Sequence, residues 1–420
     1  MAGPAAAEPY REIIFDKDGD GVAGQREALA GLAARGVTDL VVFAHGWNNT
    51  PSTARGLFQA FFAPFPALLR PGARVAYVGV AWPSVMFTDE PIPDVEAVAA
   101  AHPGKEAVAA RLGVLLREQP DDEAAFAEFG LLLRELTGVG SDPGAAGRRF
   151  TEPPDGSGGA EASEGPEVPD FLLGDPVAVC AMFVDAMEEA AGPGSVPAPR
   201  EAAFGGGLGR YWKGAREALR QATYYTMKRR AGTVGERGLG PLIGALARSS
   251  PGLRIHLVGH SMGARLVAFA LRGLPAGAGN VRSLTLLQGS FSHYAFAASL
   301  PHEPGRGGAL RDLQRRVDGP VVACYSRHDT ALGVFYPLAS RLARDAASLL
   351  GSDKRWWAIG HDGIQAVRGT AAVTLAAALD GGLPASGCVS GDAAEVVGGH
   401  SDIRHPELAR VVALAARIGG

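Results

Sequence analysis

The chain has 420 residues, of which 47% are hydrophobic and 20% are charged. This composition is typical of a folded globular protein and excludes a chain that is disordered throughout. Its 40 basic and 44 acidic residues leave a net charge of -4, which excludes the chain-wide basic field of a typical nucleic-acid-binding protein. Because single hydrophobic cores stop growing near ~250–300 residues, we expect more than one structural unit.

The first part of the chain begins with alternating strand and helix patterns. A strand pattern at 10–15 precedes a helix pattern at 24–36 and two apolar strands at 39–44 and 74–82. Helical periodicity then recurs over 93–117, 122–137 and 176–191. Residues 138–170 are mostly small, polar or helix-breaking, which predicts a flexible loop.

The alternation returns from about Trp212. Two helices are followed by predicted strands at 253–259, 283–289 and 320–326 and by predicted helices at 261–271, 337–350 and 406–418. Continuous apolar strands between helices indicate an α/β fold, with a mostly parallel sheet covered by helices on both faces. We therefore predict one core from residues 1–84 and 205–420, with residues 85–204 inserted as a helical cap or lid.

The sharpest motif is Gly259-His260-Ser261-Met262-Gly263, which has the G-x-S-x-G pattern between an apolar strand and an apolar-periodic helix. This setting places a serine on a strained turn, where Gly259 and Gly263 avoid collisions with the neighbouring elements. The motif predicts Ser261 as a nucleophile and the Met262 N–H as an oxyanion donor. A tight turn carrying an ordinary serine is the structural alternative.

A second donor is expected from the loop after an earlier strand. His45-Gly46-Trp47 follows the strand at 39–44, and Gly46 would let the backbone approach a substrate carbonyl. We therefore predict the Trp47 N–H as the other oxyanion donor. His260 is expected to face away from Ser261 and to be structural.

A serine nucleophile needs a histidine base that a carboxylate orients, and in this architecture the chain order is serine, acid, histidine. Asp329 follows the strand at 320–326 directly, which favours it as the acid; a helix N-cap is its alternative role. His400 precedes the last helix in a glycine-rich loop and is the first choice for the base. His361 is the second choice, since its spacing from Asp329 is the more usual one.

These residues resemble the α/β-hydrolase superfamily, and in particular a bacterial esterase- and lipase-like branch. The similar segments include DLVVFAHGWNN, Trp82-Pro83-Ser84, YSRHDTALGVFYPLASRLA and GGHSDIRHPELA. The resemblance implies a cofactor-independent serine hydrolase that cleaves a small-molecule carboxylic ester through an acyl-enzyme. A thioesterase, acyltransferase or peptidase would use the same triad, and a non-catalytic binding protein of the same fold is the alternative from another class.

Several other patterns permit two interpretations. Asp16, Asp18, Asp20 and Glu27 match a calcium-loop pattern, but an Asp- and Gly-rich turn explains the same residues and is the favoured interpretation. Gln288, Ser290 and His293 follow a strand and fit either a pocket lining or the core. The phenylalanines at 58, 61, 62 and 65 predict core packing or an acyl pocket, and the basic residues 228–230 predict a solvated helix end or an anion contact.

Three widely spaced cysteines and no CxxC pair predict buried free thiols and no metal site of the zinc type. The first residues have neither a basic stretch nor an apolar stretch of the secretory kind, and no run of apolar residues reaches membrane-spanning length. We therefore expect a cytoplasmic protein without a membrane span.

Overall fold

The computed structural model describes residues 8–47, 49–84, 104–138, 170–191, 207–329 and 357–419. The chain divides into two compact units, one formed by Met1–Ser84, Met227–Pro337 and Asp353–Gly420 and the other by Val85–Thr226 and Leu338–Ser352. The second unit therefore extends past residue 204 and takes in most of helix α9 (Trp212–Thr233). The predicted helix at 337–350 and nearly all of the predicted loop at 138–170 lie outside the described residues.

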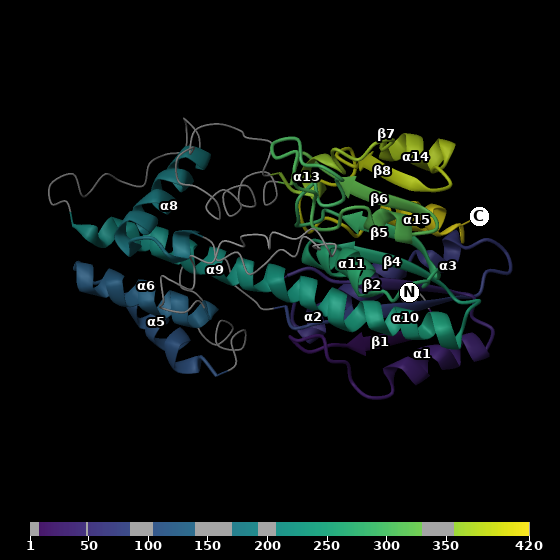
Figure 1. The fold of residues 1–420 in the computed structure, drawn as a ribbon, viewed down its shortest axis with the longest axis horizontal. Helices are drawn as coiled ribbons and strands as arrows, with labels where there is room; N and C mark the ends of the chain where they lie inside the picture. The colour runs from purple at the N-terminus through teal and green to yellow at the C-terminus, as the bar shows by residue number, and fades with distance from the viewer. Residues whose placement is uncertain are drawn as a thin grey trace, which may run out of the picture. The chain divides into compact units, whose positions relative to one another are not determined.

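The first unit is built on one sheet of eight parallel strands in the order β1-β3-β2-β4-β5-β6-β8-β7 (Figure 1). Their bounds are Tyr10–Ile14, Asp39–Ala44, Val75–Ala81, Arg254–His260, Val281–Leu287, Pro320–Tyr325, Ala371–Thr374 and Gly387–Asp392 for β1 to β8. The α/β class with a parallel sheet is thus confirmed. Strands β7 and β8 were not predicted, because AAVT is short and GCVSGD lacks a continuous apolar run.

Side chains from alternate positions of each strand enter two different apolar layers. Val41 and Phe43 of β2 belong to the core layer that contains α2 (Pro51–Phe62), α3 (Phe65–Leu68), α14 (Leu375–Gly381) and α15 (Pro406–Ala416). Leu40 and Val42 are also buried, and their alternation directs them to the opposite face. There α11 (Met262–Gly273) packs against β4 and contacts α10 (Gly240–Ser249), which in turn contacts α1 (Gln25–Ala34).

Helix α11 is held by unusually close backbone contacts. Helix α9 (Trp212–Thr233) continues through a π-helical segment, η3 (Val234–Leu239), into α10. A Cβ at Gly235 would overlap the carbonyl oxygen of Leu266, and one at Gly273 would overlap that of Glu236. Glycine therefore allows η3 and α11 to touch along their backbones, which fixes the helix that follows Ser261.

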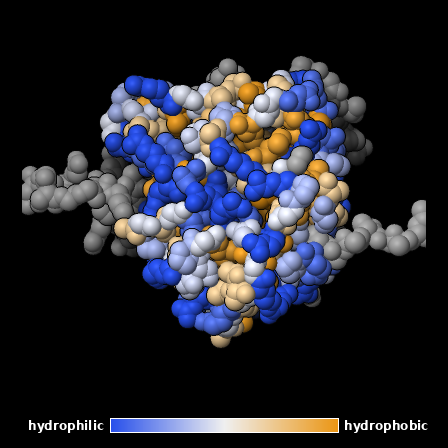
Figure 2. Space-filling model, turned by 90° about the vertical axis from the view of Figure 1, so that its right-hand side faces the viewer, coloured by the Kyte–Doolittle hydropathy of each residue, from blue (hydrophilic) through white to orange (hydrophobic). Residues whose placement is uncertain are grey.

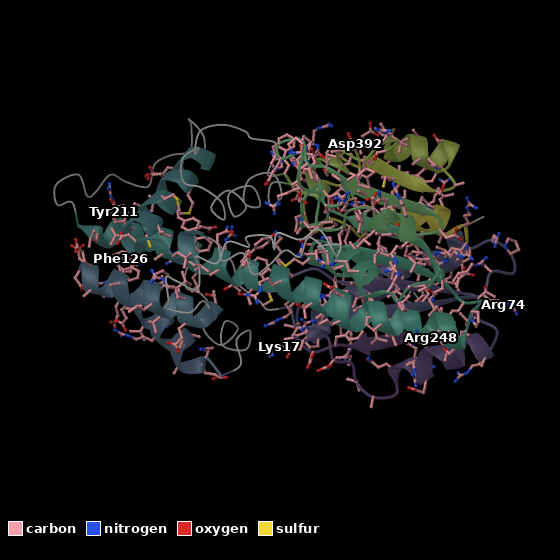
Figure 3. All side chains as sticks on the ribbon, viewed as in Figure 1. Lys17, Arg74, Phe126, Tyr211, Arg248 and Asp392 are labelled. Atoms are coloured by element: carbon pink, nitrogen blue, oxygen red, sulfur yellow. The ribbon has the colours of Figure 1, made fainter. Side chains whose placement is uncertain are left out.

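The two ends of the sheet can be recognised from labelled side chains. Arg74 and Arg248, which precede β3 and β4, lie toward one end, and Asp392, the last residue of β8, lies toward the other (Figure 3). The end with Arg74 and Arg248 carries a hydrophilic band with smaller hydrophobic areas around it (Figure 2). None of the helices in the described ranges has the length and apolar character needed to cross a bilayer.

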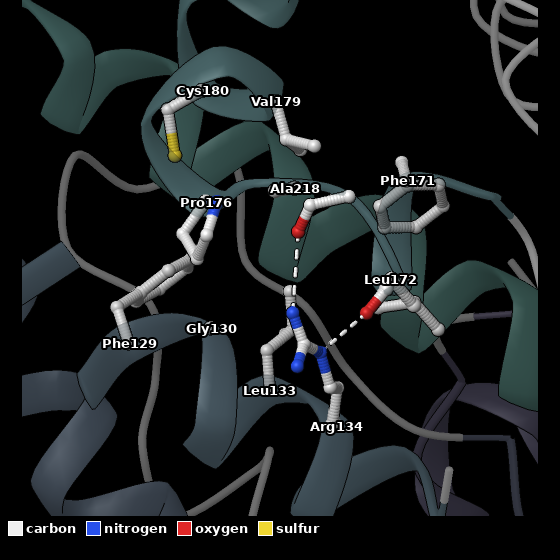
Figure 4. A pocket seen from close by; sticks show the side chains of 11 residues that line it. Phe129, Gly130, Leu133, Arg134, Phe171, Leu172, Pro176, Val179, Cys180 and Ala218 are labelled. Carbon is white, nitrogen blue, oxygen red and sulfur yellow. Dashed lines mark hydrogen bonds between the residues drawn. The ribbon is translucent and has the colours of Figure 1, made fainter. Parts of the chain in front are cut away.

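The second unit is a set of helices around an aromatic core. It contains α5 (Glu106–Glu118), α6 (Glu123–Thr137), α8 (Pro176–Ala191) and the first part of α9. The rings of Phe126 and Trp212 stack with their centroids 4.3 Å apart, and the Trp212 indole donates to the carbonyl of Pro120. Arg134 of α6 donates to the carbonyls of Leu172 and Gly174 beside a cavity of about 10 Å³, roughly the space of one water molecule (Figure 4).

Candidate active site

The turn between β4 and α11 holds Ser261 in a strained conformation. Its φ and ψ are 56° and -120°, a backbone conformation that costs a residue with a side chain about 1–3 kcal/mol. Three backbone hydrogen bonds hold it there: Ser261 N–H donates to Leu287, and the Ser261 carbonyl accepts from the N–H groups of Ala264 and Ser290. The strained serine therefore sits at the carboxyl end of a central strand.

The two flanking glycines are required by space. A Cβ at Gly259 would overlap the carbonyl oxygen of Gly263, and a Cβ at Gly263 would overlap that of Ala44. These contacts are with backbone atoms, which cannot move aside as a flexible side chain can. The motif predicted from the sequence thus has the steric basis expected of a sharp strand-to-helix turn.

Ser261, His400 and Asp329 come together in one hydrogen-bonded chain. His400 Nε2 lies 2.7 Å from Ser261 Oγ, and His400 Nδ1 lies 2.7 Å from Asp329 Oδ2. An ionised carboxylate can only accept, so Nδ1 carries the hydrogen and Nε2 of the neutral ring accepts the Ser261 hydroxyl. Asp329 is fully buried and Ser261 is 4% exposed, whereas the His400 side chain keeps 24% of its surface exposed.

His361, the second choice for the base, is not brought onto the serine. It lies in α13 (Ile359–Asp362), and its partly buried ring makes an edge contact with Trp357 at 4.6 Å between centroids. Among the residues that the structure describes, its Nδ1 has no hydrogen-bond partner, and burial lowers its pKa below the ordinary value. The histidine in the loop before the last helix, rather than the one with the more usual spacing, faces Ser261.

The turn that carries His400 is held from two directions. His260 Nε2 donates to the carbonyl oxygen of His400 at 2.8 Å, across 140 residues of sequence. Asp402 accepts from the Gly398 N–H at 2.9 Å and from His405 at 2.7 Å, and the bond from Gly398 lowers the pKa of its carboxyl. Burial, with a smaller contribution from His400, lowers the pKa of His260 to about 3, so that this ring stays neutral.

The loop after β2 is organised by Trp82. The Trp82 ring stacks on His45 with centroids 5.7 Å apart, and its indole donates to the His45 carbonyl at 2.9 Å. His45 Nδ1 donates to the carbonyl of Gly46, and burial lowers the pKa of His45 to about 4. The amide of Asn49 donates to the carbonyls of Gly46 and Trp47, both at 3.1 Å. With the carbonyls held by these donors, the loop has a fixed course.

This loop lies directly against the serine turn. A Cβ at Gly46 would lie 2.9 Å from the Ser261 Cβ and 3.0 Å from Nδ1 of His260. Trp47 follows Gly46, and Met262 is the first residue of α11, whose first N–H groups have no partner within the helix. The two predicted oxyanion donors therefore belong to segments that meet at Ser261.

One residue of the site was not singled out as catalytic from the sequence. Ser290 is 2% exposed, and its Oγ lies 2.9 Å from Ser261 Oγ. The sequence placed it among pocket or core residues with Gln288 and His293. His293 is buried with Nδ1 2.9 Å from both oxygens of Asp362, and Gln288 is completely buried. Its position in the sequence was the signal that could have identified Ser290: it follows a predicted strand, and the carboxyl ends of neighbouring parallel strands meet at one edge of the sheet.

The calcium-loop pattern folds as a turn. The Asp16 carboxylate accepts from the N–H groups of Asp18 and Asp20, and the bond from Asp20 lowers the pKa of Asp16 most. Glu27 lies on α1 and pairs with Arg26. Within the described ranges, no three histidine, cysteine, aspartate or glutamate side chains form a group that could hold a metal ion.

The remaining ambiguous residues also have defined places. All four phenylalanines at 58, 61, 62 and 65 are at most 2% exposed and pack around Phe43 and Tyr77, which is the core alternative. In the basic cluster, Arg230 donates to the carbonyl of Pro83 and is largely buried, and the carbonyl of Lys228 accepts from Arg265. This cluster therefore contributes packing as well as charge.

Among protein-family models, curated proteins and solved structures, none matches this chain.

Proposed function

We propose that this protein is a serine hydrolase of the α/β-hydrolase type that cleaves carboxylic esters through an acyl-enzyme. The observation that carries the proposal is the chain of 2.7 Å contacts from Asp329 through His400 to Ser261 at a strained turn. An ordinary turn serine would need neither the strained backbone nor a histidine oriented by a buried carboxylate.

In the first half of the proposed reaction, Ser261 Oγ attacks the acyl carbon while its proton moves to His400 Nε2. The carbonyl oxygen becomes an oxyanion that accepts hydrogen bonds from the N–H groups of Trp47 and Met262. Collapse of this intermediate breaks the bond to the alcohol oxygen, which takes the proton from His400. Asp329 stays ionised and stabilises the imidazolium that forms in between.

In the second half, a water molecule gives a proton to His400 Nε2 and its oxygen attacks the acyl carbon. The second oxyanion uses the same two N–H groups, and its collapse returns the proton to Ser261 Oγ and releases the carboxylic acid. The cycle consumes one water and needs no electron donor or acceptor. All proton transfers use Nε2, because Nδ1 keeps its hydrogen toward Asp329.

The experiment that tests this proposal is active-site labelling of the full chain with a small fluorophosphonate. We expect stoichiometric labelling of the unmodified protein and none of Ser261→Ala. The matched control is Ser283→Ala, which removes a buried serine that also contacts a histidine, and which we expect to be labelled normally. An unlabelled wild-type protein would contradict a serine hydrolase, and labelled Ser261→Ala would assign the nucleophile elsewhere.

A panel of p-nitrophenyl esters of increasing chain length then measures turnover. We expect hydrolysis of at least one ester by the wild-type protein and none above background by Ser261→Ala. Labelling without turnover of any ester would leave the nucleophile in place but contradict the ester as the substrate class.

A further inference from the structure

Ser290 contacts the atom that would react. Its Oγ lies 2.9 Å from Ser261 Oγ, and its N–H donates to the Ser261 carbonyl at 3.1 Å. The two serines are therefore joined by both side chain and backbone, although they follow different strands, β4 and β5. Ser290 is 2% exposed, so its hydroxyl is held in a site that excludes most water.

The backbone before Ser290 is also strained. Gln288 follows the last residue of β5 and has a φ of 43°, which a residue with a side chain seldom adopts. Its N–H donates to Cys324 at 3.1 Å, and the carbonyl of Gly289 accepts from Gly360 at 3.0 Å. These bonds hold a sharp change of direction at Gln288, and Ser290 follows it two residues later.

Two strained residues, Ser261 and Gln288, thus directly follow the neighbouring strands β4 and β5. The one at Ser261 exposes the proposed nucleophile, and the one at Gln288 precedes the serine that contacts this nucleophile. Such conformations are unfavourable for residues with a side chain and persist where the surrounding structure requires them, often at functional sites. A buried serine needed only for packing would not require this turn.

The available hydrogens determine which of the two serine hydroxyls donates to the other. Ser261 has one hydroxyl hydrogen, and His400 Nε2 must accept it because Nδ1 donates to Asp329. Between the two serines, Ser261 Oγ is therefore the acceptor and Ser290 is the donor. The Ser290 hydroxyl is aimed at the oxygen on which negative charge develops when the proton leaves for His400.

We propose that Ser290 is a fourth catalytic residue, which donates a hydrogen bond to Ser261 Oγ and stabilises this oxygen as it loses its proton. The inference rests on the proposed function of Ser261. The same bond keeps the Ser261 hydroxyl turned toward His400 between catalytic cycles. Ser290 accepts no proton from the substrate and forms no covalent bond.

The test compares Ser290→Ala, Ser290→Cys and Ser290→Thr in the full chain. Alanine removes the donor, cysteine keeps the approximate volume but donates weakly, and threonine keeps the hydroxyl. We expect alanine and cysteine to slow fluorophosphonate labelling and to lower kcat on an accepted ester by about three- to tenfold, the effect of one neutral hydrogen bond. KM should stay near the wild-type value, and threonine should recover most of the rate.

Thermal unfolding of each variant reports its folded fraction, and rates are normalised to that fraction. Wild-type labelling rates in both Ser290→Ala and Ser290→Cys would overturn this inference while leaving the nucleophile assignment intact. A wild-type protein that is neither labelled nor active would overturn both. Equal losses in Ser290→Cys and Ser290→Thr would also overturn it, since the rate would then follow volume and not the hydroxyl.

Discussion

The two ends of the sheet carry the same three residue types in hydrogen-bonded chains. At the carboxyl end, Ser261, His400 and Asp329 form the proposed catalytic chain. Toward the amino end, Ser283 Oγ lies 3.0 Å from Nδ1 of His256, and Nε2 of His256 lies 2.9 Å from Asp39. These distances are as short as those of ordinary catalytic hydrogen bonds.

The second chain differs from the first in how its charge is balanced. Asp39 also accepts two hydrogen bonds from Arg254, at 2.7 and 2.5 Å, and one from Thr38. Burial opposes ionisation of Asp39, but the bonds from His256 and Arg254 outweigh it and hold its pKa far below the ordinary value. The carboxylate is already paired with a permanent cation, so His256 is not needed as its partner.

The two hydrogen-bonded chains also differ in solvent exposure and in backbone conformation. His256 and Ser283 are at most 1% exposed and lie within the strands β4 and β5, not at a strained turn. Ser261 instead lies on a strained turn that meets the Gly46 loop. Residue types and distances therefore do not make a nucleophile on their own. Backbone strain, nearby N–H donors and a partly exposed histidine distinguish the proposed catalytic chain from the second one.

The largest expected difference in activity is between variants of the two histidines, His400 and His256, at the centres of the two hydrogen-bonded chains. We expect His400→Ala to lower kcat/KM by about 10⁴-fold or more, because no other group would accept the Ser261 proton. His256→Gln should keep kcat/KM within about threefold per folded molecule while lowering thermal stability. His361→Ala should also keep most activity. Steady-state kinetics on one accepted ester measure kcat/KM for the three variants. If His361→Ala lost its activity while His400→Ala kept it, the base would be His361.

The two carboxylates give the next test. Asp329→Asn should lower kcat by about 10³–10⁴-fold with little change in stability, because an amide in its place favours the wrong tautomer of His400. Asp39→Asn should retain kcat but lose about 2 kcal/mol of unfolding free energy, since it weakens the hydrogen bonds that a buried carboxylate accepts from Arg254 and His256. Urea unfolding and kcat are measured for both. If Asp329→Asn lost as much stability as Asp39→Asn, the assignment of a catalytic role to Asp329 and a stabilising role to Asp39 would be contradicted.

Two glycines near the ends of β4 test the role of the crowded backbone. Gly263→Ala would place a methyl group on the carbonyl oxygen of Ala44, so we expect a loss of about 2–3 kcal/mol and of most activity. Gly252, which precedes β4, has open space around its Cβ position, and Gly252→Ala should stay within about 0.5 kcal/mol of the wild type. Equal behaviour of the two variants in urea unfolding would refute the steric explanation.

The last prediction concerns pH. Burial lowers the pKa of His256, of His45 to about 4 and of His260 to about 3, from an ordinary value of 6.5. Below pH 6.5 the unfolded chain binds protons that the folded chain does not, so acid favours unfolding. We expect the unfolding free energy to be highest above pH 6.5 and to fall toward pH 4, by up to about 1.4 kcal/mol per pH unit for each histidine.

Urea unfolding at half-unit pH steps measures this slope, and His260→Asn should reduce it by about the contribution of one histidine. A stability that stays constant from pH 6.5 to 4.5 would show that these rings charge in the folded state.

The hydrogen-bonded chain of Asp329, His400 and Ser261 was predictable because its signals are local. Ser261 lies in a motif between two strongly patterned elements, Asp329 directly follows an apolar strand, and His400 precedes a clear final helix. The α/β class followed from continuous apolar strands in the same way. Each of these inferences needed only the residues near one position in the sequence.

The parts that were missed depend on which strands become neighbours. Ser290 contacts Ser261 because β4 and β5 pair, and His256 meets Asp39 across 217 residues because β2 and β4 pair. Strand β8 lacks an apolar run, and its position between β6 and β7 follows from the sheet and not from its own pattern. A single sequence carries little information on such long-range pairings.

The burial of the three cysteines has a practical consequence for spectroscopy. Cys180, Cys324 and Cys388 are buried as free thiols, and burial raises their pKa to about 12, 12 and 11. Since maleimides react with thiolates, these positions should stay unmodified under mild conditions. A cysteine introduced at an exposed position in each unit would then take up a fluorophore, without replacement of the three natural cysteines. The same chain could thus report distances between its two units by energy transfer.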